Sequence, residues 1–466
     1  MKKFRLAATL LFVAALSAVG LAQTVSEVFG FTGAAPAPGT VTPAQGRNGR
    51  LYGTTSGFGR TVTNGTVFSL SPIGKGGTIY TFNGTDGSHP QSSLTLATDG
   101  NYYGGATSGG TGNSGVLFRI TASGIYSALY QFSGGLDGAN PLAPPVQASD
   151  GNLYGATDGD SVTAGAFYKL VPSSGAVSTI FTLNPDGSQG SIVFAPLIQA
   201  ADGSLYATAE TGGANGCGTI LNLSTSGQLL RLYSFMCGAS GNFPAGPLVQ
   251  ASDGTIYGTT EAGGNVTSGE CANGCGIVFR MSQGLLTVLH TFSGYPNDGA
   301  FPYAGLTLGT DGNLYGATGK GGVNDLGTLY QVTTGGQCKV LYSFVDKIGS
   351  GPNASLLQHT NGTFYGVAES GGQYGAGSVY SLNMGLGSFI ALVRYTGRIG
   401  QPVQILGQGL TGSTDVTVNG VAATSFKVVS DTYMTAVIPT GATTGPVVVT
   451  TRTGTLTSNH NLRIVK

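Results

Sequence analysis

The chain has 466 residues, of which 40% are hydrophobic, and its 20 acidic and 20 basic residues cancel at neutral pH. Only 9% of the residues are charged and no basic patch is present, which excludes nucleic acid as a partner. Glycine is abundant at 81 residues but has no Gly-X-Y period. Collagen and disorder are therefore excluded, and the glycines are assigned to turns.

The N-terminus begins with a basic segment and continues into an apolar run from Leu6 to Val19, followed by small residues near Ala22. This order predicts a cleaved secretory signal over residues 1–22. The apolar run is shorter than the ~20 residues that a spanning helix needs. No later stretch is long enough, so we expect no transmembrane segment in a mature chain that is secreted, periplasmic or on the cell surface.

A segment of about 51 residues recurs seven times after the predicted signal. Each copy is centred on a tyrosine that closely follows an Asp-Gly or Asn-Gly pair. The seven tyrosines are Tyr52, Tyr103, Tyr154, Tyr206, Tyr257, Tyr315 and Tyr365. A fixed period of this length, filled with short β-patterned runs, indicates a repeat architecture, because one such unit cannot bury its own apolar face.

Each repeat is predicted to contain four short strands, which we name a to d. In the fourth repeat, strand a covers Pro196–Ala200, strand b contains Leu205 and Tyr206, strand c begins near Gly218, and strand d covers Leu232–Phe235. Proline and small residues in strand a place it innermost, since proline cannot donate to a sheet ladder. The b–c loops and the d–a connections then share one face, and the a–b and c–d turns share the other.

The strand count predicts how the repeats close. Strands a, b and c occur seven times, but only six copies of strand d lie between consecutive repeats, and the seventh is at the N-terminus, in Val28–Phe31. We therefore predict an all-β fold in which residues 23–386 form a seven-bladed β-propeller of four-stranded blades. The N-terminal strand completes the last blade and closes the ring.

The five cysteines predict two disulfides in an exported protein. Cys217 begins strand c and Cys237 ends strand d of the same hairpin, so the two fall almost opposite each other. Cys275 occupies the position of Cys217 one repeat later, and Cys271 is its natural partner. Cys338 is left as a free or buried thiol. A zinc site is not expected, because four properly spaced ligands are absent.

Four carboxylates lie at one position, four residues after the strand-b tyrosine. They are Asp158, Glu210, Glu261 and Glu369. A ring of carboxylates could coordinate a hard cation or supply an acid/base pair for sugar chemistry. Because Ser56 and Gly319 fill this position in other repeats, we favour the alternative that each carboxylate accepts hydrogen bonds from the adjacent glycine loop. Nothing in the sequence indicates a cofactor.

Two further candidates are better explained by packing. His290 lies in a strand d beside Phe292, where a packing or surface role is expected rather than a place in a Ser-His-Asp triad. The tyrosines of strands b and d could stack on sugars, but a residue that recurs in every blade is expected to pack between sheets.

A different β pattern begins after Tyr380, with strand candidates at Val403–Gly407, Val416–Val418 and Val447–Val449. The segment resembles the IPT/TIG family of immunoglobulin-like domains. The features that carry the resemblance are Gly407-Gln408-Gly409-Leu410, Val418-Asn419-Gly420, Ile438-Pro439 and Gly445-Pro446-Val447. It implies an immunoglobulin-like β-sandwich over residues 387–466 that serves as a spacer or binding module and is usually non-catalytic.

The repeats themselves resemble the tandem-repeat family called GloVer, which occurs in exported bacterial proteins. The resemblance rests on the Leu-Tyr-Gly of strand b, Thr211-Gly212-Gly213, Cys217-Gly218-Thr219 and Leu232-Tyr233-Ser234-Phe235. The resemblance implies export and a repeat architecture. It implies no particular activity, because the family has none established.

Three functions are compatible with these patterns. The first is a non-enzymatic binding or adhesion protein whose partner is a polysaccharide or a cell-surface protein. The second is a carbohydrate-active hydrolase or lyase that uses the carboxylates, and the third is a structural cell-surface component. In each case we expect any site on the b–c loop face, where loop length and sequence vary most. The longest insertion, Asn265–Asn273, lies beside Glu261.

Overall fold

The computed structural model describes residues 23–32, 41–57, 63–159, 165–264 and 271–465. The predicted signal peptide lies outside these residues, as does most of the insertion in the fifth repeat. Within the described ranges, no helix is long and apolar enough to cross a membrane.

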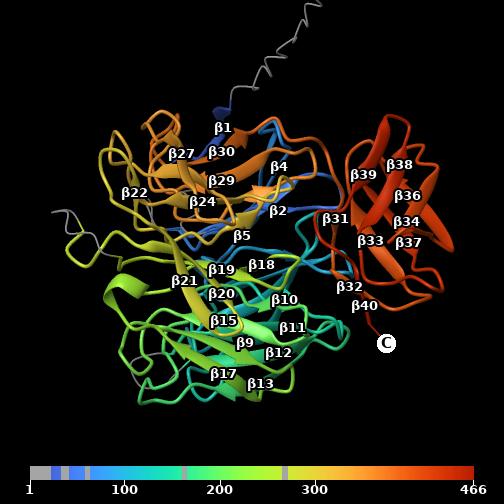
Figure 1. The fold of residues 1–466 in the computed structure, drawn as a ribbon. Helices are drawn as coiled ribbons and strands as arrows, with labels where there is room; N and C mark the ends of the chain where they lie inside the picture. The colour runs from blue at the N-terminus through green and yellow to red at the C-terminus, as the bar shows by residue number, and fades with distance from the viewer. Residues whose placement is uncertain (1–22, 33–40, 58–62, 160–164, 265–270, 466) are drawn as a thin grey trace, which may run out of the picture.

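The described residues before 387 form seven four-stranded antiparallel sheets that follow one another along the chain (Figure 1). The first consists of β2 (Ala44–Gln45), β3 (Leu51–Thr55), β4 (Thr66–Leu70) and β5 (Gly76–Thr81), paired in chain order. The next five, in the same order, are β6 (Thr95–Leu96), β7 (Tyr102–Ala106), β8 (Val116–Ile120) and β9 (Tyr126–Gln131); β10 (Val146–Gln147), β11 (Leu153–Thr157), β12 (Ala166–Val171) and β13 (Ala176–Thr182); β14 (Ile198–Gln199), β15 (Leu205–Ala209), β16 (Thr219–Leu223) and β17 (Leu229–Ser234); β18 (Val249–Gln250), β19 (Ile256–Thr260), β20 (Ile277–Ser282) and β21 (Leu285–Thr291); and β23 (Thr307–Leu308), β24 (Leu314–Thr318), β26 (Thr328–Val332) and β27 (Cys338–Ser343).

The seventh sheet joins the two ends of the repeat region. It contains β28 (Leu357–Gln358), β29 (Phe364–Ala368), β30 (Ser378–Asn383) and, as its outer strand, β1 (Thr24–Gly30). β1 pairs antiparallel with β30 from Thr24 opposite Asn383 to Gly30 opposite Ser378. The prediction that the N-terminal strand completes the last sheet is confirmed.

Apolar cores lie between neighbouring sheets, including the last and the first. Buried Phe31 and Tyr365 of the seventh sheet pack with Phe68 of the first, and the Phe31 and Phe68 rings meet edge to face at 5.5 Å. The strand-b tyrosines are part of these cores; Tyr154, for example, is fully buried between the third and fourth sheets. Their recurrence therefore serves packing, and the sheets are arranged like propeller blades.

The innermost strands are shorter than the sequence predicts. Strand a of the fourth repeat is predicted over Pro196–Ala200, but only Ile198 and Gln199 pair with β15. A proline has no amide hydrogen to donate to the ladder, which is consistent with a strand that begins after Pro196.

A glutamine in the inner strand links each of five sheets to the sheet before it. Its Oε1 accepts a hydrogen bond from a backbone amide in the preceding a–b turn, at 2.7–3.0 Å. The pairs are Gln45 with Thr360, Gln147 with Thr98, Gln199 with Ser149, Gln250 with Ala201, and Gln358 with Thr310. These bonds satisfy amides that would otherwise be left unpaired at the crowded axis.

Both predicted disulfides are present. Cys217 and Cys237 join the two strands of one outer hairpin with a Cα–Cα distance of 5.5 Å, and Cys271 joins Cys275 with 5.1 Å. Cys338 is a free, half-buried thiol, and burial, assisted by the nearby Asp298 carboxylate, raises its pKa to about 12. Two disulfides indicate an oxidising, extracytoplasmic compartment.

The C-terminal unit consists of two four-stranded sheets around one core that includes Ile405, Val416, Met434 and Val449. Its sheets, in spatial order, are β31 (Ala391–Leu392), β33 (Pro402–Leu406), β37 (Tyr433–Val437) and β36 (Ser425–Ser430); and β35 (Val421–Ala422), β34 (Asp415–Val418), β38 (Val447–Thr451) and β39 (Gly454–Thr457). Two further pairs are β32 (Thr396–Gly397) with β40 (Arg463–Ile464) and, beside the sixth sheet, β22 (Gly299–Ala300) with β25 (Lys320–Gly321).

The C-terminal unit, red in Figure 1, docks on the a–b turn face of the seven sheets. Arg47, in the first a–b turn, donates from Nη2 to Thr98 O at 2.7 Å and to Gln404 Oε1 at 2.9 Å. Its guanidinium lies 4.7 Å from the ring centre of Tyr433, and its carbonyl accepts from Thr432 Oγ1 at 2.7 Å. The face with the b–c loops and d–a connections is the opposite one.

Candidate functional site

A cavity of about 470 Å³ is lined by residues from all seven repeats and therefore lies at the axis around which the sheets are arranged. The lining comes mainly from two positions in each repeat, just before the inner strand. Twelve residues before the strand-b tyrosine are Gln91, Leu142, Phe194, Ala245, Tyr303 and Asn353. Ten residues before it are Thr42, Ser93, Pro144, Pro196, Pro247 and Ser355. We call this space the axial cavity.

The wall of the axial cavity has an apolar side and a polar side. The third to fifth repeats supply the apolar side, with Leu142, Phe194 and three prolines, and the fourth and fifth repeats also supply Glu210 and Glu261. The sixth, seventh, first and second sheets supply the polar side, with Tyr303, Asn353, Ser355, Thr42 and Gln91. A mostly apolar cavity with a few convergent polar groups is typical of a small-ligand site.

The four predicted carboxylates each follow the end of a strand b, and the backbone of each is fixed by one recurring hydrogen bond. The amide of Glu210 donates to Ile192 O at 2.7 Å, and the amide of Glu261 donates to Phe243 O at 2.9 Å. The amides of Asp158 and Glu369 bond in the same way to Asn140 O and Gly351 O. Each bond ties the end of strand b to the d–a connection that lines the axis, and so the four side chains lie on one face.

The four side chains differ in what they contact. Glu210 and Glu261 line the axial cavity. Glu369 accepts a 2.9 Å hydrogen bond at Oε2 from Nδ2 of Asn353, a residue of the cavity wall. Asp158 accepts from the amide of Gly159 at 2.8 Å, which is the kind of local bond expected of a turn carboxylate. Glu210 and Glu261 are therefore the carboxylates best placed to contact a ligand.

Burial and, for Glu210, the charges of neighbouring carboxylates raise the pKa values of three of these side chains. Burial, followed by the charges of Glu261 and Asp158, raises the pKa of Glu210 to about 7. Burial raises the pKa of Asp158 to about 6 and also raises the pKa of Glu261, which the hydrogen-bonding Tyr303 hydroxyl partly offsets. Within the described ranges, the one ion pair is His290–Asp298, so no lysine or arginine there neutralises these carboxylates.

The sequence as a whole matches the model of the Gloeobacter/Verrucomicrobia repeat over residues 17–195, 157–271 and 265–413. Together these matches cover most of the chain. The chain belongs to the Gloeobacter/Verrucomicrobia repeat family. This agrees with the resemblance found in the repeat motifs, and no curated protein matches the chain.

Solved structures similar to this Gloeobacter/Verrucomicrobia repeat protein share little sequence with it. Hydrazine synthase from Kuenenia stuttgartiensis is 12% identical with a TM-score of 0.50, over 72% of this chain and 93% of that one. A 6-phosphogluconolactonase candidate from Bacteroides fragilis is 16% identical with a TM-score of 0.47, over 68% and 88%. A gluconolactonase from Xanthomonas campestris is 13% identical with a TM-score of 0.38, over 77% and 99%. At these identities the likeness concerns the fold alone.

The carboxylates of the repeat protein do not form a metal-binding set. Among the residues that the structure describes, no three His, Cys, Asp or Glu side chains are grouped closely enough to hold an ion. Hard cations such as Ca²⁺ take six to eight oxygen ligands. The geometry therefore gives the cation-binding alternative no support.

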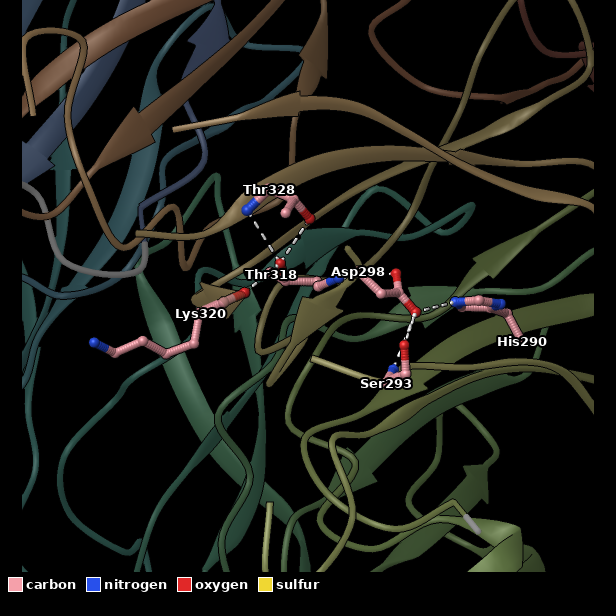
Figure 2. A network of polar contacts seen from close by, with 7 residues as sticks. His290, Ser293, Asp298, Thr318, Lys320 and Thr328 are labelled. Atoms are coloured by element: carbon pink, nitrogen blue, oxygen red, sulfur yellow. Dashed lines mark hydrogen bonds and ion pairs between the residues drawn. The ribbon is translucent and has the colours of Figure 1, made fainter. Parts of the chain in front are cut away.

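His290 belongs to a structural pair rather than a catalytic triad (Figure 2). Its Nε2 lies 3.1 Å from Asp298 Oδ2, and Ser293 Oγ lies 3.4 Å from the same oxygen. In a triad the imidazole stands between the carboxylate and the hydroxyl, whereas here the carboxylate stands between the other two. Lys320 extends away from this carboxylate in Figure 2.

The same pair recurs in other repeats with tyrosine in place of histidine. The Tyr130 hydroxyl donates to Asp137 Oδ2 at 3.0 Å, and Tyr130 precedes Phe132 just as His290 precedes Phe292. The His290 ring packs edge to face on Phe292 at 4.8 Å. The expected packing role of His290 agrees with this arrangement.

Sequence reasoning missed Tyr303, Asn353 and Ser355, which complete the polar side of the axial cavity. Aligning the repeats on their tyrosines would have placed them in the columns ten and twelve residues upstream. In the twelve-residue column the side chain changes from apolar to polar around the ring, and such variation within a structural repeat is a signal of ligand contact.

The cluster predicts that Glu210→Gln stabilises the protein at neutral and alkaline pH. The folded state binds the Glu210 proton more tightly than the unfolded state, because its pKa is raised from 4.5 to about 7. Parental stability should therefore fall as pH rises from 4.5 to 7 and stay level above that range. After allowing for the solvent screening of a partly exposed carboxylate, Glu210→Gln should gain about 1–2 kcal/mol at pH 8.

Urea unfolding of the parent and of Glu210→Gln at pH 4.5 and pH 8 measures this gain. The two proteins should differ little at pH 4.5. A variant less stable than the parent at pH 8 would show that the ionised carboxylate makes stabilising contacts instead.

Proposed function

We propose that this protein is an exported binding protein in which the seven sheets form a seven-bladed β-propeller and the axial cavity receives the end of a saccharide chain. The observation that carries the proposal is the convergence of residues from every repeat on this one cavity. Its apolar side suits the apolar face of a sugar ring, and its polar side offers partners for hydroxyl groups.

The C-terminal unit fits this proposal as a module of the IPT/TIG type. Its bonds to Arg47, Thr98 and Thr360 cover the a–b turn face, so a ligand would enter from the face of the b–c loops and d–a connections. This is the face on which loop variation predicts recognition. The sandwich then acts as a spacer or an interaction module on the far side of the site.

Glycan-array binding by the purified mature chain tests the proposal, with Ala245→Phe as the cavity-filling variant. Phe194 occupies the equivalent position in the preceding repeat, so a phenylalanine side chain is compatible with this part of the fold. The parent should bind a defined set of glycans, and Ala245→Phe should lose that binding.

The matched control is Ala122→Phe, which makes the same change in an exposed turn between β8 and β9. It should bind as the parent does. If no glycan binds, or if Ala245→Phe binds unchanged, the axial cavity is not a saccharide site.

A hydrolase or lyase is the second candidate, and one observation favours it. Glu210, whose pKa is raised to about 7, lies beside a second carboxylate, Glu261, and a general acid in glycoside hydrolysis needs such a raised pKa. Turnover assays on polysaccharides that bind in the array decide between the two. Release of new reducing ends, abolished by Glu210→Gln and Glu261→Gln, would make the protein an enzyme.

A further inference from the structure

We propose that the axial cavity selects saccharides that carry a free, protonated amino group over their N-acetylated or uncharged counterparts. This inference rests on the proposed saccharide-binding function and adds the chemical class of the ligand. Three features of the cavity support it: uncompensated negative charge, an orphan buried hydroxyl, and a wall with one apolar side.

The first feature is negative charge without a partner. Burial, followed by the charges of Glu261 and Asp158, raises the pKa of Glu210. The pKa of Tyr303 is likewise raised by burial and then by nearby carboxylates, of which Glu261 and Glu210 line the cavity. In the described part of the chain, none of these carboxylates is paired with a lysine or arginine. An ammonium group on a ligand would supply the missing positive charge, and the apolar wall would strengthen the charge-assisted hydrogen bond.

The second feature is Ser355. This residue lines the axial cavity and is only 8% exposed, yet its Oγ has no hydrogen-bond partner. At the equivalent position in the second repeat, Ser93 Oγ accepts a 2.8 Å hydrogen bond from the amide of Thr42. Buried hydroxyls are nearly always paired. An unpaired one in a cavity wall therefore points to a ligand hydroxyl.

The third feature is the apolar side of the wall, and the three features together distinguish an amino sugar from a simple alkylamine. An alkylamine could pair with Glu210 and Glu261 and lie on the apolar side, but it would leave the Ser355 hydroxyl unsatisfied. An amino sugar brings an ammonium group, hydroxyl groups and an apolar ring face in one molecule. It can meet the carboxylates, Ser355 and the side formed by Phe194 and the prolines together.

The proposal predicts a pH dependence with a definite sign. An ammonium group favours ionised Glu210, whereas burial and then the charged neighbours Glu261 and Asp158 raise the pKa of Glu210 and favour its protonated form in the free protein. Affinity should therefore be lower at pH about 5.5, where Glu210 is protonated, than near pH 7, where ionised Glu210 and the protonated sugar amine are both populated. A neutral saccharide should show no such loss.

Isothermal titration with a disaccharide of glucosamine and with its di-N-acetylated counterpart tests the inference. At pH 7.5 the free-amine form should bind at least about ten-fold more tightly, which is the typical effect of one charge-assisted hydrogen bond. Glu210→Gln should remove most of this preference, because it weakens binding of the free-amine form far more than binding of the acetylated form. Glu27→Gln, the same substitution on the outer strand β1, should keep the preference intact.

The outcomes separate this inference from the proposed function. Equal affinity for the two disaccharides, or tighter binding of the acetylated one, overturns the selectivity and leaves the saccharide site in place. A preference that survives Glu210→Gln also overturns it. If neither disaccharide binds, the inference is wrong, and the glycan array alone decides whether the cavity takes another saccharide.

Discussion

A mature chain that lacks residues 24–30 is expected to unfold at a markedly lower temperature than the parent and to associate in solution. These residues form β1, which supplies the outer strand of the seventh sheet and pairs with β30 from Thr24 to Gly30. Its loss leaves the edge of β30 without hydrogen-bond partners, and an exposed edge strand is a template for pairing with another chain.

The deletion also damages the core between the seventh and first sheets. Val28 and Phe29 pack against a cluster that contains Phe68 and Tyr365, and Phe29 supports the ring of Phe31 at 5.2 Å. The decrease in the free energy of unfolding should therefore far exceed the ~1 kcal/mol of a typical point substitution. Differential scanning calorimetry and size-exclusion chromatography of the deleted and parental chains measure it.

A synthetic peptide of residues 23–32 provides the control. If β1 acts by completing the sheet, the peptide added in trans should pair with β30 and restore part of the stability, as a donated strand does elsewhere. A deleted chain that melts cooperatively at the parental temperature and stays monomeric would contradict the closure of the ring by β1.

The architecture of this protein is readable from the sequence because it depends on a local pattern repeated seven times. The tyrosine after each Asp-Gly or Asn-Gly pair marks strand b, and the missing strand d shows where the ring closes. The position of Cys217 and Cys237 on one hairpin was likewise predictable, because strand register follows from the turn between the two strands.

The axial cavity and the docking of the C-terminal unit could not be predicted in the same way. Gln147 and Thr98 meet only because two sheets approach at the axis, and Arg47 meets Gln404 and Tyr433 across 357 and more residues of chain. Such contacts depend on how whole sheets pack. The sequence identified the carboxylate ring as a column of equivalent positions, but it could not distinguish Glu210 and Glu261, which line the cavity, from Asp158.

Replacing Cys217 and Cys237 together by serine is expected to lower the free energy of unfolding by about 2–4 kcal/mol, since the disulfide closes a loop in the unfolded chain. The two cysteines are 20 residues apart and join the start of β16 to the end of β17, so the bond holds the outer edge of the fourth sheet. Phe235 lies in the core shared with the fifth sheet and precedes Cys237 by two residues. Loss of the bond should therefore loosen that edge first.

Denaturant unfolding under oxidising and reducing conditions measures this effect. The parent should lose stability when reduced, and the double serine variant should lose much less, because only the four-residue Cys271–Cys275 loop remains to be opened and a short loop constrains the unfolded chain less. Cys338→Ser is the control, since Cys338 forms no disulfide. It should keep the parental response to reductant. A double variant as stable as the oxidised parent would show that the strands of the fourth sheet hold the hairpin without the bond.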